Sequence, residues 1–368
     1  MHILLIGGTG TLSTAVRSEA LARGYEVTIF NRGSNNNNVP NKVEIILGDF
    51  KKEESLYKNF ANASYDVVVD FLSRTTDDIS RVYPIFKNKC KQYIFISTAC
   101  VYRRDKADFP IREDSVKPNI NWEYNIQKFE CEKKLKELNI QASSYYTIVR
   151  PYITYDYERI PIGIAPVYKY HRTIIERIKA GKPMFTWDDG LTTTTVTSTE
   201  DFANAMVGLF LNEKARNEDF HITSDFCYSC RDLLRIVFDT IGVKANIISF
   251  SIEEIAKVMP QYRGMLIGDR GLDAIFDNTK VKEAIPNLTF KVDAAEGIKR
   301  IYQYYDTLAS RNYDYAFDGQ VDRLLKKKGV KCKYVKYPGT KGCSKLKYMI
   351  YRELPFTLAR KLSHLLKI

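Results

Sequence analysis

The sequence predicts an α/β fold in which a doubly wound parallel sheet precedes a smaller, mostly helical region and a basic C-terminal tail. Short apolar strands alternate with helical segments over the first 150 residues. These strands are apolar throughout, which is typical of a parallel sheet covered by helices on both faces. Positive charge is concentrated after residue 320. Together these observations divide the chain into a sheet domain at 1–150, a second region at 151–310 and an extension at 311–368.

The elements of the first region follow one another in regular alternation. Strands are expected at 2–8, 26–30, 43–47, 65–72, 92–97 and 145–149. Helices are expected at 11–23, 53–62, 76–87 and 122–138. Gly24 should end the first helix, because glycine readily adopts the left-handed conformation found at helix C-termini. The polar run 34–38 reads as a loop.

Beyond residue 150 the alternation becomes irregular. Helices are expected at 164–180, 198–211, 231–241, 252–259, 278–284 and 294–308, with short strands between them. This pattern predicts a substrate-binding region that is partly interleaved with the sheet.

Composition narrows the class of protein further. The chain is 45% hydrophobic and contains no apolar run of the roughly 18 residues that a membrane span needs. The N-terminus is a buried strand without a basic leader, so the protein is expected in the cytoplasm with reduced thiols. One close cysteine pair, Cys227 and Cys230, lacks the second pair of a zinc site. We interpret it as a turn into a helix capped by Ser229; a redox pair is the alternative. No metal is expected.

A glycine turn joins the first strand to the first helix, at residues 7–13. Gly7 permits the tight turn, and Gly10 leaves room for a pyrophosphate at the helix N-terminus, where free amides and the helix dipole attract anions. Ser13 stands where a third glycine is usual, and its small side chain still permits close helix–strand packing. This context predicts a Rossmann-type dinucleotide site; an ordinary tight connection is the alternative.

The end of the second strand favours one cofactor over the other. An acidic residue that would bind a ribose 2′-hydroxyl is missing there, and Asn31-Arg32 takes its place. A guanidinium can bind a 2′-phosphate through two hydrogen bonds, so NADP is favoured over NAD. In the alternative, Arg32 lies over the adenine or in solvent.

Three residues form a candidate catalytic set. Tyr124 and Lys128 lie one turn apart on one face of a predicted helix. A tyrosine hydroxyl has a pKa of about 10, and a neighbouring ammonium stabilises its phenolate and brings that pKa toward neutrality. Thr98 follows the fifth strand, at the sheet edge where ligands of open α/β sheets bind.

In these motifs the chain resembles the extended short-chain dehydrogenase/reductases of the NAD-dependent epimerase/dehydratase family, from residue 1 to about 305. The glycine turn, Gly48-Asp49-Phe50, the run 66–70, the run 97–102, Tyr124/Lys128 and Arg150-Pro151 carry the resemblance, with Trp187–Gly190 and Thr199–Ala203 in the second half.

The resemblance implies a role for each residue of the site. Tyr124 would be the acid/base, Lys128 would bind the nicotinamide ribose and the tyrosine, and Thr98 would replace the usual catalytic serine or threonine. Asp49 would contact the adenine amine. Further cofactor contacts are expected at Gly7, Gly10, Thr11, Leu12, Asn31, Arg32, Phe50 and Leu72.

The family also limits the reaction. Its sugar-nucleotide 4,6-dehydratases resemble one another in a Thr-Asp-Glu motif, whereas Ala99-Cys100 follow Thr98 here, so dehydration is disfavoured. The remaining isomerase and oxidoreductase reactions are epimerisation and ketone reduction of a nucleotide sugar. By analogy with the family, these reactions would serve polysaccharide biosynthesis. The family also suggests a homodimer that forms through helices 76–87 and 122–138. Residues 192–195 lack the arginine that often meets the substrate phosphates.

The tail accounts for the whole net charge of +12. Residues 321–368 include fourteen Lys and Arg residues but only two acidic residues, Asp322 and Glu353. Its central lysines are Lys326, Lys327, Lys328, Lys331, Lys333, Lys336, Lys341, Lys345 and Lys347. Apolar residues then recur at helical spacing from 356 to 366, as in a basic amphipathic helix. Packing on the protein itself or on a partner ranks first, contact of 321–368 with an anionic membrane second, and nucleic acid third.

A protein of another class remains the rival interpretation. Chloroplast stem-loop RNA-binding proteins resemble the chain at the glycine turn and at residues 31–33, and a basic tail would suit them. A non-catalytic binding protein has no need of Thr98, Tyr124 and Lys128 together. The enzyme is therefore the leading hypothesis and nucleic acid an unlikely partner.

Overall fold

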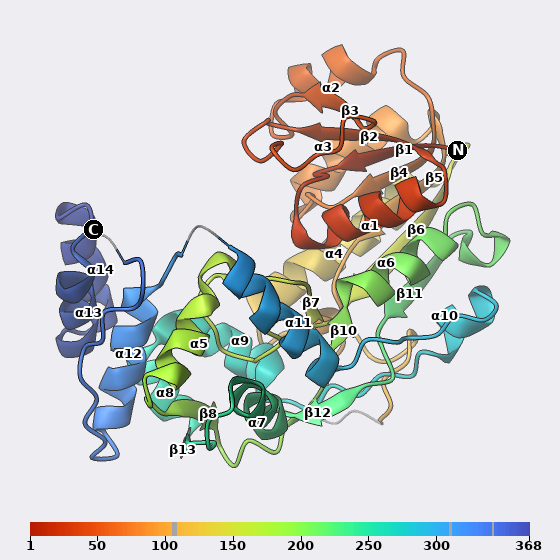
Figure 1. Ribbon diagram of the computed structural model, residues 1–368. Helices are drawn as coiled ribbons and strands as arrows, with labels where there is room; N and C mark the ends of the chain where they lie inside the picture. The colour runs from red at the N-terminus through yellow and green to blue at the C-terminus, as the bar shows by residue number, and fades with distance from the viewer. Residues whose placement is uncertain (105–108, 309–310, 341) are drawn as a thin grey trace. The chain divides into compact units, whose positions relative to one another are not determined.

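In the computed structural model the chain forms two compact units (Figure 1). The structure describes residues 1–104, 109–308, 311–340 and 342–368, so Lys341 of the predicted tail lies outside the described residues. Unit 1 contains Met1–Thr154, Thr197–Asp225 and Ile275–Val292. Unit 2 contains Tyr155–Val196, Phe226–Ala274 and Asp293–Ile368. Each unit is therefore assembled from three separate segments of the chain.

Unit 1 is built on a seven-stranded sheet in the order β11-β6-β5-β4-β1-β2-β3, in which every neighbouring pair is parallel. Its strands are β1 (His2–Ile6), β2 (Glu26–Asn31), β3 (Glu44–Leu47), β4 (Tyr65–Asp70), β5 (Cys90–Ile96), β6 (Tyr145–Pro151) and β11 (Glu218–Ile222). Because all strands run the same way, the loops after them meet at one edge of the sheet. The predicted Rossmann-type sheet is confirmed.

In the described part of unit 1, six helices pack around this sheet (Figure 1). They are α1 (Thr11–Ala22), α2 (Glu53–Phe60), α3 (Thr76–Phe86), α4 (Glu123–Leu138), α6 (Thr199–Gly208) and α10 (Thr279–Ala284). Short elements are η1 (Ala99–Val101), β10 (Thr197–Ser198) and η3 (Glu213–Ala215), and β7 (Thr154–Tyr155) lies at the end of the first segment. Helix α1 packs against α6, and α3 packs against both α2 and α4 (Figure 1).

One core cluster shows why the strands read as fully apolar. Leu4 and Ile6 of β1 pack with side chains of α2, α3 and α4, such as Phe60, Tyr83 and Leu135. Successive side chains of a strand point to opposite faces, so Ile3 and Leu5 face the other side of the sheet. They are fully buried as well. Burial on both faces removes the polar alternation of a half-exposed strand.

Unit 2 is mostly helical. Its helices are α5 (Arg172–Lys179), α7 (Cys230–Ile241), α8 (Ile252–Val258), α9 (Arg263–Met265), α11 (Ala294–Thr307), α12 (Tyr315–Lys326), α13 (Ser344–Glu353) and α14 (Phe356–Leu365). Short turns are η2 (Tyr168–Tyr170), η4 (Pro260–Tyr262) and the π-helical η5 (Leu266–Arg270). Strand β8 (Met184–Trp187) pairs with β13 (Ile247–Phe250), and β9 (Thr193–Thr195) pairs with β12 (Cys227–Ser229). Ser229 caps α7 by accepting from the Asp232 amide, as predicted.

Several predicted boundaries were wrong. The helix expected at 164–180 begins only at Arg172: Pro166 disfavours helix in the residue before it, and Tyr168–Tyr170 forms a separate 3₁₀ turn. The strand expected at 65–72 ends at Asp70, whose carboxylate draws the Leu72 and Ser73 amides into a turn. The strand expected at 2–8 ends at Ile6, because Gly7 has a φ of 94°.

Much of the basic tail packs inside unit 2. Helix α12 carries Asp318 and Asp322, which bind the buried Arg177 of α5 and the buried Lys182 at N–O distances of 2.6 to 2.8 Å. Burial opposes ionisation of Asp322, but the two cations still hold its pKa below the usual range. Tyr348 of α13 donates to Asp322 at 2.5 Å. The first alternative for the tail, packing on the protein itself, therefore holds for α12 and α13.

Candidate cofactor and catalytic site

The glycine turn is shaped by close packing at two of its glycines. A Cβ on Gly7 would lie 2.7 Å from the Leu72 side chain, and one on Gly8 would lie 2.3 Å from Ile29. Real Cβ atoms do not approach so closely, so Leu72 in the loop after β4 and Ile29 of β2 favour glycine at these two positions of the turn. Leu72, an expected cofactor contact, thus lies beside the turn.

Gly10 differs from its neighbours. Its φ of −84° is open to any residue, and a Cβ there would meet only the Ser13 hydroxyl, at 3.6 Å. The protein's own packing therefore leaves room at Gly10. Helix α1 has no acidic residue in its first turn and no side-chain cap, so the amides of Thr11 and Leu12 remain available to an anion. This arrangement fits a pyrophosphate.

Ser13 replaces the usual third glycine and closes the turn. Its hydroxyl donates to the carbonyl of Gly7 at 2.6 Å and accepts from the amide of Gly10 at 2.9 Å. The substitution therefore adds two hydrogen bonds across the turn without blocking the packing of α1.

The two residues at the end of β2 have different surroundings. The Asn31 amide group donates to Asn36 at 2.8 Å and accepts from the Gly33 amide at 2.7 Å, so it organises the following loop. Arg32 is exposed and makes no ion pair with any residue that the structure describes. It is the side chain at this end of β2 that is free to meet an added phosphate.

Asp49 and Phe50 follow β3 at the same edge. A Cβ on Gly48 would lie 2.4 Å from the Phe30 ring, which shows how tightly this loop is held. Asp49 accepts from the Lys51 amide and is partly exposed, whereas Phe50 is buried under the Arg81 guanidinium. Adenine recognition by Asp49 and Phe50 stays a prediction.

Lys128 of α4 lies buried at the carboxyl edge. Its Nζ donates to the carbonyls of Ser73, at 2.8 Å, and Ile96, at 2.7 Å. Burial lowers the pKa of Lys128 to about 8. Asp70 supports this geometry, because it accepts from the Ser73 amide and hydroxyl and from Tyr93. The loop after β4 and the end of β5 thus meet at one ammonium group.

Tyr124 lies on α4 together with Lys128, and Thr98 lies at the N-cap of η1. Thr98 is buried at the start of η1, where its hydroxyl accepts from the Cys100 amide at 3.2 Å. Tyr124 lies one turn before Lys128, partly buried, with its ring 5.0 Å from that of Trp122. Helix α4 packs against η1. The three residues therefore share one region of unit 1, and their catalytic roles remain predictions.

A buried ion pair behind this region was not anticipated. Glu132, one turn after Lys128, accepts from Arg150 at 2.9 and 2.7 Å and from the Ser97 hydroxyl at 2.5 Å. Both members of the pair are about 1% exposed. The spacing Lys128-x-x-x-Glu132 was the available signal, but it looks like an ordinary charged helix face.

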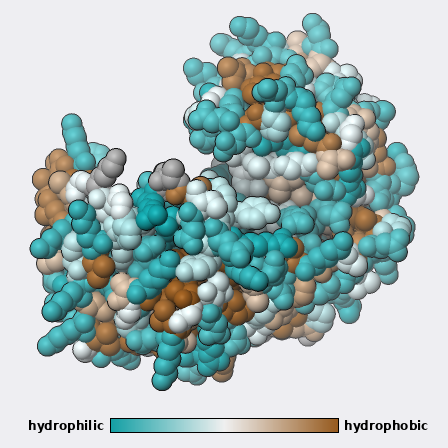
Figure 2. Space-filling model, in the orientation of Figure 1, coloured by the Kyte–Doolittle hydropathy of each residue, from teal (hydrophilic) through white to brown (hydrophobic). Residues whose placement is uncertain are grey.

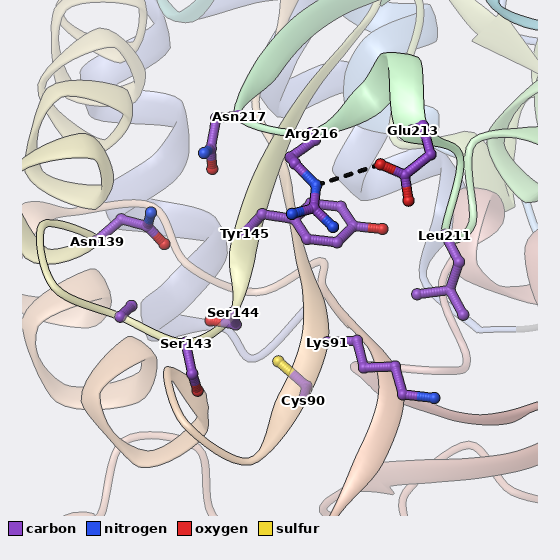
Figure 3. Close-up of a pocket in the computed structure, with 11 residues that line it drawn as sticks. Cys90, Lys91, Asn139, Ser143, Ser144, Tyr145, Leu211, Glu213, Arg216 and Asn217 are labelled. Atoms are coloured by element: carbon purple, nitrogen blue, oxygen red, sulfur yellow. Dashed lines mark ion pairs between the residues drawn. The ribbon is translucent and has the colours of Figure 1, made fainter.

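A cavity of about 580 Å³ lies away from these residues (Figure 3). It is lined by the first residues of β5 and β6, Cys90 and Tyr145, and therefore lies at the amino edge of the sheet. Arg216 faces the Tyr145 ring and pairs with Glu213 at 3.5 Å (Figure 3). None of the predicted site residues lines this cavity. Among the described residues no cluster of three metal-ligating side chains occurs.

The parallel sheet and the glycine turn at its carboxyl edge define a protein of the Rossmann class. The model of the NAD dependent epimerase/dehydratase family matches residues 3–223, and the chain belongs to this family. A curated relative is the chloroplast stem-loop binding protein of 41 kDa b of Arabidopsis thaliana, 25% identical over 236 residues. The match covers 61% of this chain and 58% of the relative, which is less than two thirds of its length.

Solved structures share the fold at low sequence identity. An epimerase of Methanothermobacter thermautotrophicus superposes with a TM-score of 0.68 at 15% identity, over 83% of this chain and 92% of its own. The UDP-glucose 4-epimerase of Thermotoga maritima, solved with UDP-glucose, has a TM-score of 0.65 at 20% identity, over 83% and 99%. The UDP-glucuronic acid 4-epimerase of Bacillus cereus, solved with UDP-glucuronic acid and NAD, has a TM-score of 0.65 at 18% identity, again over 83% and 99%.

Within the residues that the structure describes, no helix has the length and apolar character needed to cross a bilayer.

Proposed function

We propose that the protein is an NAD(P)-dependent epimerase or ketone reductase that acts at one carbon of a nucleotide-sugar-like substrate. The observation that carries this proposal is the buried ammonium of Lys128, with a pKa lowered to about 8, one helical turn from Tyr124 at the carboxyl edge of the sheet. Family membership and the nucleotide-sugar epimerases of the same fold support it.

The glycine turn would hold the cofactor. The free first-turn amides of α1 and the open space at Gly10 suit the pyrophosphate, and Asp49 suits the adenine amine. The exposed Arg32 would bind a 2′-phosphate, which favours NADP. When bound, the nicotinamide supplies a hydride acceptor or donor.

The protein's own groups would move the proton. Tyr124 would take a proton from the substrate hydroxyl as the carbon is oxidised, and return it on reduction. The positive charge on Lys128 favours the phenolate of Tyr124, and Thr98 would hold the substrate oxygen by a hydrogen bond. Ala99 and Cys100 after Thr98 supply no carboxyl for elimination, so dehydration is not part of the proposal.

The first experiment identifies the cofactor. The purified protein is denatured and any released dinucleotide is analysed, and affinities for NADPH and NADH are then measured by titration. Tightly retained NAD would indicate an epimerase that recycles its cofactor. Exchangeable NADPH would indicate a reductase in which Arg32 binds the 2′-phosphate of the cofactor. Failure to bind either dinucleotide would overturn the enzyme hypothesis.

A second experiment tests the acid/base. The Tyr124→Phe variant should lose turnover by a factor of at least about 10² while binding the dinucleotide almost as well as wild type. Tyr57→Phe removes the hydroxyl of an exposed tyrosine of α2 and is the matched control. Wild-type turnover in Tyr124→Phe would show that another group transfers the proton.

RNA binding is the second candidate, because the curated relative is named a stem-loop binding protein and the tail is basic. It predicts stem-loop RNA binding that weakens steeply with salt. An RNA gel shift on the Tyr124→Phe variant, beside a turnover assay of wild type, separates the two functions. A protein that only binds RNA would keep its RNA affinity in the variant. Its wild-type form would show no cofactor-dependent turnover.

Two partner contacts belong to the same proposal. A homodimer would use α3 and α4, which are neighbours in unit 1. Contact with an anionic membrane would use α14, where Leu358, Leu365 and Leu366 are exposed and hydrophobic surface is visible (Figure 2). Light scattering measures the first, and co-sedimentation with anionic vesicles measures the second.

A further inference from the structure

A second cavity, of about 870 Å³, lies within unit 2 in the C-terminal extension. Its walls come from η2, from the segment before α12 and from the start of α13. Tyrosine and threonine side chains form part of the wall, including Tyr170, Tyr313 and Thr340. Three cationic residues, Arg311, Lys347 and Lys367, line the rest. The cavity therefore combines positive charge with hydroxyl groups.

The positive charge in this cavity is only partly neutralised. Among the described residues no aspartate or glutamate lines it, and none of the three cationic side chains makes an ion pair there. The carboxylate of Ile368 can offset one charge at most. Asp314 lies outside the cavity lining; it caps α12 by accepting from the amides of Ala316 and Phe317, both at 3.0 Å, and also interacts electrostatically with Lys347.

The beginning of α13 adds to this field. Its N-cap residue, Cys343, makes no side-chain cap, and its first turn contains no acidic residue. Lys345 and Lys347 stand in that first turn instead. Cations near the positive end of a helix dipole are unfavourable, whereas an anion there would be stabilised by the dipole and by the free amides.

We propose that this cavity is a binding site for a phosphate group, held by Arg311, Lys347 and Lys367. Arginine and lysine are the side chains that bind phosphate most strongly. The site uses no residue of the glycine turn or of the catalytic set, so it stands independently of the proposed enzymatic function. The phosphate can belong to a soluble ligand or to a lipid headgroup.

Calorimetric titration with inorganic phosphate tests the site. The double variant Arg311→Ala/Lys347→Ala should bind phosphate at least about tenfold more weakly than wild type, because two charge-assisted contacts are lost. Lys345→Ala is the matched control: it removes a lysine of the same helix turn that is exposed and does not line the cavity. Equal affinity in the double variant and wild type would overturn the proposal, as would absence of saturable binding in wild type.

A chemical footprint locates the binding without mutagenesis. Cys343 lines the cavity and is exposed, and Cys227 is exposed elsewhere in unit 2. Phosphate at saturation should slow alkylation of Cys343 by iodoacetamide several-fold and leave that of Cys227 unchanged. Equal rates at Cys343 with and without phosphate would place any phosphate binding at another site and contradict the proposal.

Two further probes distinguish the sources of the phosphate. Inorganic pyrophosphate represents soluble ligands, and vesicles of phosphatidylglycerol in phosphatidylcholine represent lipid headgroups. Protection of Cys343 by pyrophosphate alone supports a soluble ligand. Protection by the anionic vesicles, lost in the double variant, supports a headgroup. Protection by neither probe contradicts phosphate recognition in this cavity.

Discussion

Single buried polar residues hold the carboxyl edge of the sheet in unit 1 in place. Glu132 binds Arg150 and Ser97, and Ser97 directly precedes Thr98. Leaving one charge of such a buried pair alone typically costs about 3–5 kcal/mol. The position of Thr98 thus depends on a carboxylate that has no part in the proposed proton transfer.

Glu113 is a largely buried carboxyl group whose pKa lies well above its usual value. Its Oε1 accepts from the His221 amide at 3.1 Å, and burial raises the pKa of Glu113 to about 7. Burial also lowers the pKa of His221 to about 4, so this imidazole is neutral at pH 7 and does not compensate a carboxylate.

A carboxyl whose pKa is higher in the folded state stabilises the protein below its unfolded pKa. This contribution is lost as the pH rises from about 4.5 through about 7. Glu113→Gln, which stays uncharged, should therefore gain stability relative to wild type between pH 5 and pH 8, by as much as roughly 3 kcal/mol. Urea unfolding at both pH values measures the difference. A difference that does not change with pH would show that Glu113 is ionised in the folded protein already at pH 5.

At the scale of the element, two glycines of the β1–α1 turn are expected to have different roles: Gly8 serves packing and Gly10 serves ligand binding. Gly8→Ala drives a Cβ into Ile29 and should destabilise the protein by about 1–3 kcal/mol. Gly10→Ala meets open space, so its free energy of unfolding should fall by no more than about 1 kcal/mol, while dinucleotide affinity falls at least about tenfold. Urea unfolding and dinucleotide titration of both variants are the measurements. Unchanged affinity in Gly10→Ala would place the pyrophosphate elsewhere.

Elements with strong local signals were predicted well, and boundaries decided by side chains were not. Helix α11 was expected at 294–308 and is found at Ala294–Thr307, with Asp293 as its N-cap. In contrast, β4 stops where Asp70 captures two backbone amides. A sequence pattern shows which residues are apolar, but it does not show which amide a carboxylate will bind.

At the scale of the whole molecule, the C-terminal extension is part of the core of unit 2. Removing residues 309–368 would leave Arg177 and Lys182 without Asp318 and Asp322. We expect the 1–308 chain to lose at least about 3 kcal/mol of stability. A 1–354 chain, which lacks only α14, should lose much less. Thermal and urea unfolding of both chains test this, and wild-type stability of the 1–308 chain would show that the extension is an independent domain.

The sequence by itself determined the Rossmann-type sheet, the glycine turn and the positions of Thr98, Tyr124 and Lys128 along the chain. These features depend on local periodicity and on residue types at fixed spacing, which are visible in one dimension. Only the tertiary structure decided that Lys128 lies between the Ser73 and Ile96 carbonyls, that Glu132 is buried against Arg150, and that Asp318 and Asp322 bury themselves in unit 2. Partners in these contacts are 18 to 145 residues apart in sequence. From sequence alone, a charged residue on a helix is predicted to be exposed to solvent. The oppositely charged residue that allows it to be buried lies far away in sequence and becomes its neighbour only in the folded chain.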